Sequence, residues 1–235
     1  MSVVPAGRVI AVTGLAIEAR IAQGPGVIAL ASGGDARRLV SALEREIARG
    51  ANAIMSFGIA GALAADLAAG TWLVARTIVT PTANWQADPE WTRAIAARLP
   101  GALTANLAGV DAIVATAAAK HALRRDTGAA SVDTESHVAA EIAAAHGLPF
   151  AAFRVVADPA RRTLPPSVHV ALRADGRVNR TAVLASLVRT PSQLGLLART
   201  AIDAHVAFRA LSRGRRRLGP GLGYTDLGEL VLDVP

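Results

Sequence analysis

The chain has 235 residues, of which 52% are hydrophobic and 3% aromatic, and its formal net charge is +7. This length and apolar content are sufficient for a substantial core and favour one domain over residues 1–235. The chain contains no cysteine, which excludes disulfide bonds and cysteine-ligated metal sites. No signal peptide is recognisable, and the longest uncharged run, residues 50–65, is too short to span a bilayer, so we expect a cytoplasmic protein.

Positive charge is concentrated in the C-terminal third. Residues 161–217 contain 12 arginines and 2 acidic residues, a balance of +10, whereas the rest of the chain balances at −3. Such a segment favours an anionic partner, either nucleic acid or a membrane surface that the protein contacts peripherally. The compositional alternative is a general bias, since the chain has 24 arginines and one lysine, Lys120. Aromatic residues for base stacking are absent from the segment apart from Phe208, so nucleic acid is the less favoured partner.

The first quarter of the chain predicts alternating strands and helices. Its apolar runs, expected to form buried strands, cover residues 8–13, 27–31 and 51–57. Residues 35–48 place Leu39, Leu43 and Ile47 at intervals of four, which predicts a helix with one apolar face. Glycine-rich turns separate these elements, but no complete dinucleotide-binding or P-loop fingerprint is present. This alternation is typical of an α/β protein.

The remaining elements follow the same alternation until the C-terminal part. Further strands are predicted at residues 71–80, 102–105 and 110–115, and further helices at residues 89–99 and 120–126. A loop at 161–166, two apolar runs at 168–172 and 183–187, and a long helix at 192–212 come last. The apolar stripe of that helix consists of Leu194, Leu197, Ala201, Ala204, Phe208 and Leu211. We expect the stripe to pack on the core; an exposed stripe would instead be an oligomer or membrane contact.

The stretch from residue 131 to 159 carries most of the functional signal. An acidic cluster precedes a predicted helix that ends at Gly147, and a buried strand follows and ends at Asp158-Pro159. Ligands of open α/β sheets bind where strands end, so Glu135 and Asp158 are expected to face one cleft. The structural alternatives are that Glu135 caps the helix and that Asp158 is a turn residue before the proline.

The sequences VDTESHV (132–138) and GLPFAAFRVVAD (147–158) resemble the signature of the nucleoside phosphorylase and nucleosidase superfamily. That superfamily includes purine nucleoside phosphorylase and methylthioadenosine/S-adenosylhomocysteine nucleosidase. The resemblance implies a three-layer α/β/α sandwich with a mixed central sheet. It also implies that Glu135 binds the ribose hydroxyls, helped by the backbone of Asp133 and Thr134, and that Asp158 protonates the departing purine. No cofactor or metal is implied, and a homo-oligomer is expected.

The chemistry of N-glycosidic cleavage independently suits these two acids. The reaction builds positive charge on the sugar and negative charge on the base. A carboxylate on the 2′ and 3′ hydroxyls meets the first need, and a carboxylic acid with a raised pKa, able to protonate a ring nitrogen, meets the second. The five histidines lack metal-ligand spacing, so no metal site is predicted.

A glutamate near the N-terminus is a second candidate catalytic residue. In the superfamily a strand and a glycine open the chain, and in its nucleosidase branch a glutamate just beyond that glycine activates the attacking water. Gly14 and Glu18 match these places. The structural alternative is an exposed acid on a short helix.

The segment FGIAGAL (57–63) resembles the superfamily's second signature. The resemblance implies that the backbone of Gly58, Ala60 and Gly61 contacts the sugar and the nucleophile. Phosphorolytic members place an arginine and a serine in this loop, whereas the matching positions here are Ser56 and Ile59. The difference weakens the case for phosphorolysis but leaves phosphate open as a co-substrate, with Arg20 or Arg76 as candidate contacts.

Among the branches of the superfamily, the chain most resembles the bacterial hopanoid-associated phosphorylases. The resemblance rests on DTES (133–136), RVVADPA (154–160), the loop with two prolines and the arginine-rich C-terminal helix. It implies that the substrate is adenosylhopane, from which adenine is released. One alternative is a methylthioadenosine/S-adenosylhomocysteine nucleosidase. Relatives that act on such small nucleosides often have an aromatic residue that stacks on the base just before the helix predicted at residues 120–126, and residues 115–119 contain none, which counts against this alternative. The other is a non-catalytic nucleotide- or nucleic-acid-binding module.

Overall fold

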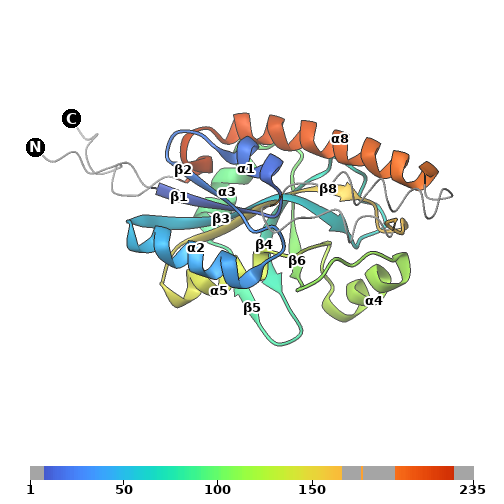
Figure 1. Cartoon of the computed structure of the whole chain (residues 1–235), viewed down its shortest axis with the longest axis horizontal. Helices are drawn as coiled ribbons and strands as arrows, with labels where there is room; N and C mark the ends of the chain where they lie inside the picture. The colour runs from blue at the N-terminus through green and yellow to red at the C-terminus, as the bar shows by residue number, and fades with distance from the viewer. Residues whose placement is uncertain (1–7, 166–175, 177–193, 225–235) are drawn as a thin grey trace, which may run out of the picture.

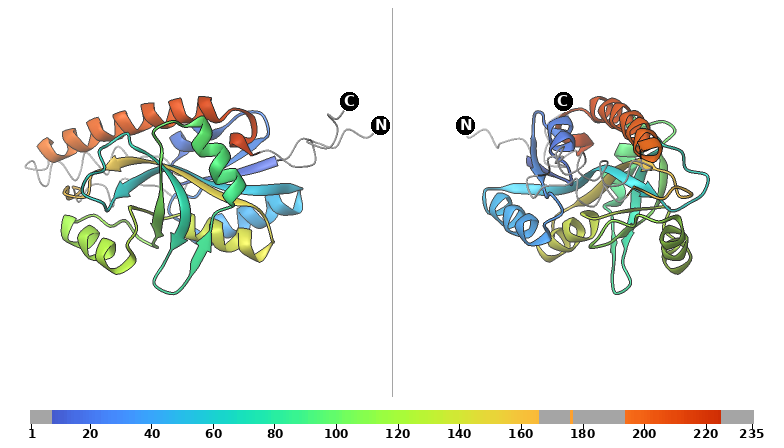
Figure 2. Two further views of the ribbon diagram at one scale, coloured as in Figure 1. Left: turned by 180° about the vertical axis from the view of Figure 1, so that it is seen from behind. Right: turned by 45° about the vertical axis from the view of Figure 1, so that its right-hand side comes forward.

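The computed structural model describes residues 8–165, 176 and 194–224. Its centre is an eight-stranded mixed sheet with helices on both faces (Figures 1 and 2). The strands are β1 (Arg8–Thr13), β2 (Val27–Ala31), β3 (Ala51–Ala62), β4 (Trp72–Val79), β5 (Asn84–Gln86), β6 (Leu103–Gly109), β7 (Ser131–Asp133) and β8 (Phe150–Asp158). The helices are α1 (Ala16–Ala22), α2 (Ala36–Ala48), α3 (Pro89–Arg98), α4 (Ala117–Thr127), α5 (Ser136–Ala145) and α8 (Leu194–Leu218), followed by the 3₁₀ helix η2 (Pro220–Gly223).

The strand pairing brings several strand ends to one place. The sheet runs β2-β1-β3-β7-β6-β4-β5, and β8 pairs with both β3 and β4. Strands β3, β7, β6, β4 and β8 therefore form a closed ring, while β2 with β1 and β5 extend the sheet outside it. Strands β3 and β8 are parallel, so their carboxyl ends lie at the same end of the ring.

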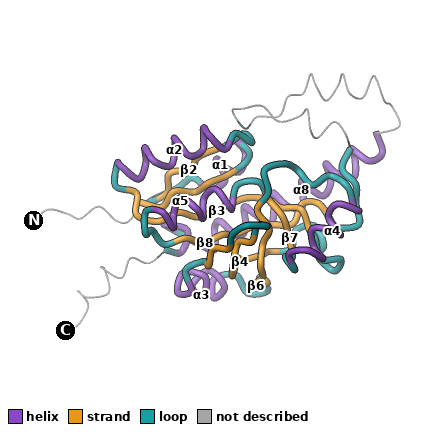
Figure 3. Tube along the Cα trace, turned by 90° about the horizontal axis from the view of Figure 1, so that it is seen from below, coloured by secondary structure: helices purple, strands orange, loops and turns teal. Residues whose placement is uncertain are grey.

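Two hydrophobic clusters lie on opposite faces of the sheet, between its strands and the helices; Figure 3 shows the trace of these elements from below. One cluster joins the sheet to α1, α3 and α8 through Ala22, Trp91, Ile95, Ala207 and Leu211. The other joins it to α2 and α5 through Leu39, Leu43, Val138, Ala139 and Ala143. This arrangement is the three-layer α/β/α sandwich with a mixed sheet that the sequence resemblance implies.

Local signals explain most helix ends. The side chains of Asp35, Asp88 and Thr116 each accept a hydrogen bond from a backbone N–H in the first turn of α2, α3 and α4. Gly128 ends α4 at φ 68°, and Gly147 follows α5 at φ 63°, both in the left-handed conformation that glycine adopts without strain. Because Thr116 provides the cap, α4 begins before the predicted residue 120.

One predicted strand is wrong. Residues 110–115 form a loop, and the neighbouring strand β6 is longer than predicted, over Leu103–Gly109. The backbone N–H of Val110 bonds to the carbonyl of Asp133, after which the chain leaves the ladder. Apolar character alone therefore misidentified a loop whose side chains line a cavity. Strand β3 also runs past the predicted residue 57, because its last residues pair with both β7 and β8.

Helix α8 differs most from its prediction. It continues to Leu218, so the basic segment 213–217 is helical. Gly214 permits close packing on the sheet, since a Cβ there would lie 2.5 Å from Cζ of Phe153. The predicted apolar stripe is buried only at the C-terminal end, where Leu211 is inaccessible, whereas Leu194 is 63% exposed. The reason is geometric: the amino-terminal half extends past the end of β8 (Figure 1).

The predicted apolar runs at 168–172 and 183–187 lie outside the described residues, as does the last residue of the predicted loop 161–166. None of the helices in the described parts of the chain combines the length and apolar character needed to cross a bilayer.

Candidate functional site

A cavity of about 300 Å³ lies at the carboxyl ends of β3, β7 and β8. Its wall contains most of the residues singled out in the sequence: Glu18, Ala60, Gly61, Asp133, Thr134, Glu135 and Asp158. Gly58 is not in the wall but lies directly behind Glu18. The register of β3 and β8 explains this convergence, because Gly58 is opposite Arg154 and Gly61 is opposite Asp158.

Glu18 is buried, which rules out the exposed-acid alternative. Its side chain is held by backbone N–H groups from two elements: Oε2 accepts from Gly14 (3.0 Å) and Leu15 (2.7 Å), and Oε1 accepts from Ile59 (2.7 Å). Burial raises the pKa of Glu18 to about 7, against the opposing effect of the Arg154 guanidinium. A carboxyl group with this pKa is suited to accept a proton near neutral pH.

The absence of a side chain at Gly58 leaves room for the carboxylate of Glu18. A Cβ added there would lie 2.6 Å from Oε1 of Glu18 and 2.9 Å from Nη1 of Arg154. Any side chain at this position would therefore displace both charged groups. The sequence resemblance implies that the backbone of residues 57–63 approaches a ligand closely. In the structure, this backbone lies against the carboxylate of Glu18.

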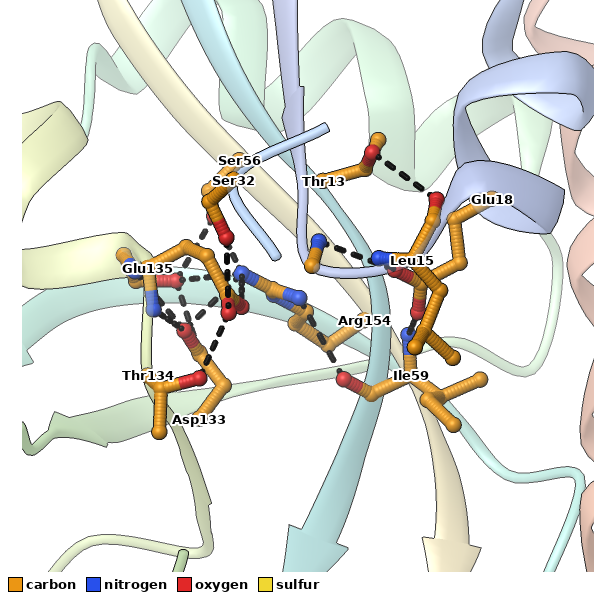
Figure 4. A network of polar contacts seen from close by, with 12 residues as sticks. Thr13, Leu15, Glu18, Ser32, Ser56, Ile59, Asp133, Thr134, Glu135 and Arg154 are labelled. Atoms are coloured by element: carbon orange, nitrogen blue, oxygen red, sulfur yellow. Dashed lines mark hydrogen bonds and ion pairs between the residues drawn. The ribbon is translucent and has the colours of Figure 1, made fainter. Parts of the chain in front are cut away.

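Arg154 is the central charge of the site, and the sequence interpretation missed it (Figure 4). The side chain is completely buried, and Nη2 donates to Ser56 Oγ (2.5 Å), Asp133 Oδ1 (2.8 Å) and Glu135 Oε2 (3.3 Å). Burial by itself lowers its pKa, but the carboxylates around it outweigh that effect and raise the pKa. A permanent cation thus lies among several carboxylates.

The two acidic residues of segment 133–135 have different roles. Asp133 is the residue that caps α5: its Oδ1 accepts from the N–H groups of Glu135 (2.9 Å) and Ser136 (2.7 Å). Glu135 makes no side-chain cap hydrogen bond, so the capping alternative for this residue is wrong. Its carboxylate instead accepts from the hydroxyl of Thr134 (2.5 Å) and lines the cavity. Two carboxylate oxygens at the cavity wall are suited to accept from a pair of vicinal hydroxyls.

Asp158 lines the same cavity at the end of β8 and is more than a turn residue. Its Oδ2 accepts a hydrogen bond from Nζ of Lys120, whereas its buried Oδ1 has no hydrogen-bond partner among the described residues. Burial raises the pKa of Asp158, and the lysine partly offsets this. Burial also lowers the pKa of Lys120, and the carboxylate partly offsets that change.

Apolar side chains form the rest of the cavity wall. Val110, Ile113 and Val114 come from the loop that was predicted as a strand, Leu164 from the loop after β8, and Ala204 from α8. Within the described residues the wall contains no aromatic side chain, and residues 115–119 are not part of it. Arg20 and Arg76, considered as phosphate contacts, are exposed and lie outside the wall, so the arginine of the site is neither of them. No cluster of metal-binding side chains occurs in the described parts of the chain.

A sequence signal for Arg154 existed, whereas none existed for Lys120. Arg154 interrupts an apolar strand four residues before Asp158, and side chains separated by four residues lie on the same face of a strand. Lys120 lies on a helix predicted to be polar, 38 residues before Asp158, where a lysine is unremarkable.

Comparisons with known proteins agree with this geometry. A family model described as the phosphorylase superfamily matches residues 9–190, and no curated protein matches the sequence. An S-adenosylhomocysteine nucleosidase from Streptococcus pyogenes has a similar structure, with 16% identity, a TM-score of 0.59, and coverage of 86% of this chain and 98% of that one. A 5′-methylthioadenosine/S-adenosylhomocysteine nucleosidase from Helicobacter pylori has 15% identity, a TM-score of 0.60, and coverage of 91% and 99%. Futalosine hydrolase from the same species has 15% identity, a TM-score of 0.58, and coverage of 90% and 97%.

Proposed function

This chain belongs to the phosphorylase superfamily, and on that premise we propose that it releases adenine from a 5′-substituted adenosine by hydrolysis of the N-glycosidic bond. The observation that carries the proposal is that two acids with different partners line one cavity. Glu18 lies with Arg154 and Glu135 in one part of the wall, the first end, and Asp158 lies with Lys120 in another part, the second end. Such a pair separates the proton acceptor from the proton donor.

At the first end, Glu18 takes the proton of the attacking water. Its pKa of about 7 leaves it ionised in a large fraction of molecules at neutral pH. Glu135 accepts the ribose 2′ and 3′ hydroxyls, and its negative charge stabilises the cationic sugar as the bond to the base breaks. Arg154 holds Glu135 in position through its hydrogen bond at 3.3 Å.

At the second end, Asp158 delivers a proton to the departing adenine. Oδ2 is engaged by Lys120 and Oδ1 is buried without a hydrogen-bond partner among the described residues, so the carboxyl group must rotate to bring an O–H to the base. Protonation of a ring nitrogen lets the base leave as a neutral molecule, and the pair of electrons of the C1′–N bond stays with it.

Hydrolysis is favoured over phosphorolysis by the contacts of Glu18. The backbone N–H groups of Gly14, Leu15 and Ile59 are donors that a bound anion would use, and the Glu18 carboxylate already occupies them. Ser56, the expected phosphate-loop position, is buried and accepts from Arg154 and Ser136. A phosphate dianion bound beside these groups would be repelled by the carboxylates of Glu18 and Glu135.

For the 5′ substituent we propose the lipid of adenosylhopane, which the sequence resemblance implies. The cavity, about 300 Å³, is at the small end for a ligand site and suits a nucleoside but not an added polycyclic lipid. The lipid would therefore extend outward past the apolar wall toward the amino-terminal half of α8, where Leu194, Ile202 and Val206 are exposed. Arginines on the same helix, such as Arg199 and Arg209, are suited to an anionic membrane surface.

The experiment is adenine release from adenosylhopane and from methylthioadenosine, each with and without phosphate. We expect release that needs no phosphate, yields free reducing sugar and is faster for adenosylhopane. Glu18→Gln should abolish it, and Glu141→Gln, an exposed acid on α5, is the matched control. Release that depends on phosphate would overturn hydrolysis. Equal or faster cleavage of methylthioadenosine would favour the alternative, a methylthioadenosine/S-adenosylhomocysteine nucleosidase.

A further inference from the structure

The only lysine of the chain lies behind the cavity wall, against the carboxyl group of Asp158. Lys120 is 0% exposed, although lysine is among the residues least often fully buried. Its Nζ donates to Oδ2 of Asp158 and to the backbone carbonyls of Pro159 (3.2 Å) and Arg162 (2.9 Å). An ammonium group has three protons, so this environment satisfies each of them. The ammonium is thus fixed against the carboxyl group that faces the base.

The surroundings of this pair reduce the difference in proton affinity between its two groups. Burial lowers the pKa of Lys120 and raises that of Asp158, which brings the two groups closer in proton affinity. Among the described residues, the one other charge that acts on both groups is Arg162, which lowers the pKa of both and is itself paired with Asp203 of α8. Within the described residues, the proton that reaches Asp158 has no equally close source.

We propose that Lys120 is the positioning residue that supplies, through Asp158, the proton taken by the departing adenine; this inference rests on the proposed function. An N–H bond of Lys120 breaks and an O–H bond forms on Oδ2 of Asp158, and rotation of the carboxyl group then turns this O–H toward the base. Asp158 in turn gives its proton to a ring nitrogen of the base as the C1′–N bond breaks and its electron pair moves to the base. Lys120 is left as a neutral amine and regains a proton from solvent after the products leave.

The test uses two substitutions that remove the transferable proton in different ways. Lys120→Met removes the charge and all three donors, whereas Lys120→Gln keeps amide donors for the carbonyls of Pro159 and Arg162. We expect both variants to lose adenine release by on the order of 100-fold, the usual contribution of general acid catalysis. Arg125→Met, an exposed cation on the same helix, should leave the rate unchanged.

Two readouts separate proton supply from a merely structural role. First, Asp158→Asn should cost about as much as Lys120→Gln, and the double variant should cost no more than either, because both act in one step. Second, the wild-type rate should fall at high pH, as Lys120 loses its proton below the pKa of an ordinary lysine, and this limb should be absent from Lys120→Gln. Recovery of the rate by glutamine, additive losses in the double variant or an unchanged alkaline limb would each overturn the proposal.

The same experiment distinguishes failure of this inference from failure of the proposed function. Loss of adenine release in Glu18→Gln and Asp158→Asn, with a normal rate in Lys120→Met, would overturn only the role of the lysine. Wild-type protein that releases no adenine, or release that survives both acid substitutions, would overturn the proposed function and with it the proton path. Thermal unfolding of each variant shows whether the rates refer to folded protein.

Discussion

The two ends of the cavity contain the same kind of group but are built differently. Glu18 is held by backbone N–H groups from two segments, at Gly14-Leu15 and Ile59, whose positions follow from strand pairing. The side chain of Asp158 is held by one side chain, Lys120, which also donates to the carbonyls of Pro159 and Arg162 in the loop after β8. Strand register therefore places both acids, but the contacts of the Glu18 carboxylate, at the sugar end, come from the backbone, whereas those of the Asp158 carboxylate, at the base end, come from a single side chain.

The largest effect should come from removing the cation of the sugar end. Arg154→Met leaves the buried carboxylates of Asp133, Glu135 and Glu18 without their shared positive charge. We expect a loss of about 3–5 kcal/mol in the free energy of unfolding, as for other broken buried ion pairs, together with loss of activity. Urea denaturation measures it, and Arg209→Met, an exposed arginine on α8, is the control. An equal stability for Arg154→Met and wild type would contradict the central role of this cation.

The next effect tests whether the sugar end depends on backbone shape. Gly58→Ala places a methyl group 2.6 Å from Oε1 of Glu18, so the carboxylate must move. We expect adenine release to fall by about 100-fold, because small displacements of a reacting group have effects of this size. Gly195→Ala, where nothing lies within 4 Å of the added carbon, should have no such effect. A normal rate in Gly58→Ala would mean that Glu18 need not be held where it is.

A smaller effect is expected when pH is varied, because the rate of adenine release should change gradually with pH. Only the ionised form of Glu18 accepts a proton, and burial raises its pKa to about 7. Its ionised fraction therefore falls as pH decreases through 7, and the rate should fall about tenfold per unit below that value. Rate measurements between pH 5 and pH 8, roughly the range over which such a group titrates, check this. The acidic limb should be absent from the residual activity of Glu18→Gln; its persistence there would assign the limb to another group.

The smallest effect should come from the apolar wall. Ala204 of α8 lines the cavity, and Ala204→Phe would narrow it without touching either acid. We expect the KM of nucleosides with bulky apolar 5′ substituents to rise by about tenfold, a typical cost of one misfitting hydrophobic group, and that of methylthioadenosine to change less. Steady-state kinetics with both substrates give the ratio. A larger effect on methylthioadenosine would place the 5′ substituent elsewhere in the cavity.

Local elements of this protein were predictable from short windows of sequence. The bounds of β1 and β2 match their predicted apolar runs, and α2 begins directly after Asp35 as its periodicity and cap indicate. The left-handed glycine after α5 was also predicted correctly. These features depend on neighbouring residues only, because capping and hydrophobic periodicity act over a few turns or a few residues of strand.

Part of the site was predictable from the positions of its residues along the sequence. Glu135 and Asp158 each follow an apolar segment at a strand end, and both line the cavity. The roles of Asp133 and Glu135 were less predictable, since both precede α5 and either carboxylate has the reach to cap it. The structure assigns the cap to Asp133, whose Oδ1 accepts from two backbone N–H groups.

Most strands and helices and the two acidic strand ends could be predicted from the residues, and the layer architecture from the resemblance to the superfamily. Strand register and helix placement bring Arg154 to the buried acids and Lys120 to Asp158, and they leave the amino-terminal half of α8 beyond the sheet. The physical reason is the distance along the sequence between the residues that determine each feature. A cap or an apolar face is a property of adjacent residues, whereas a charge pair in a cavity depends on strand register and helix placement over many tens of residues. Burial then changes the pKa values of these groups, and burial exists only in the folded chain.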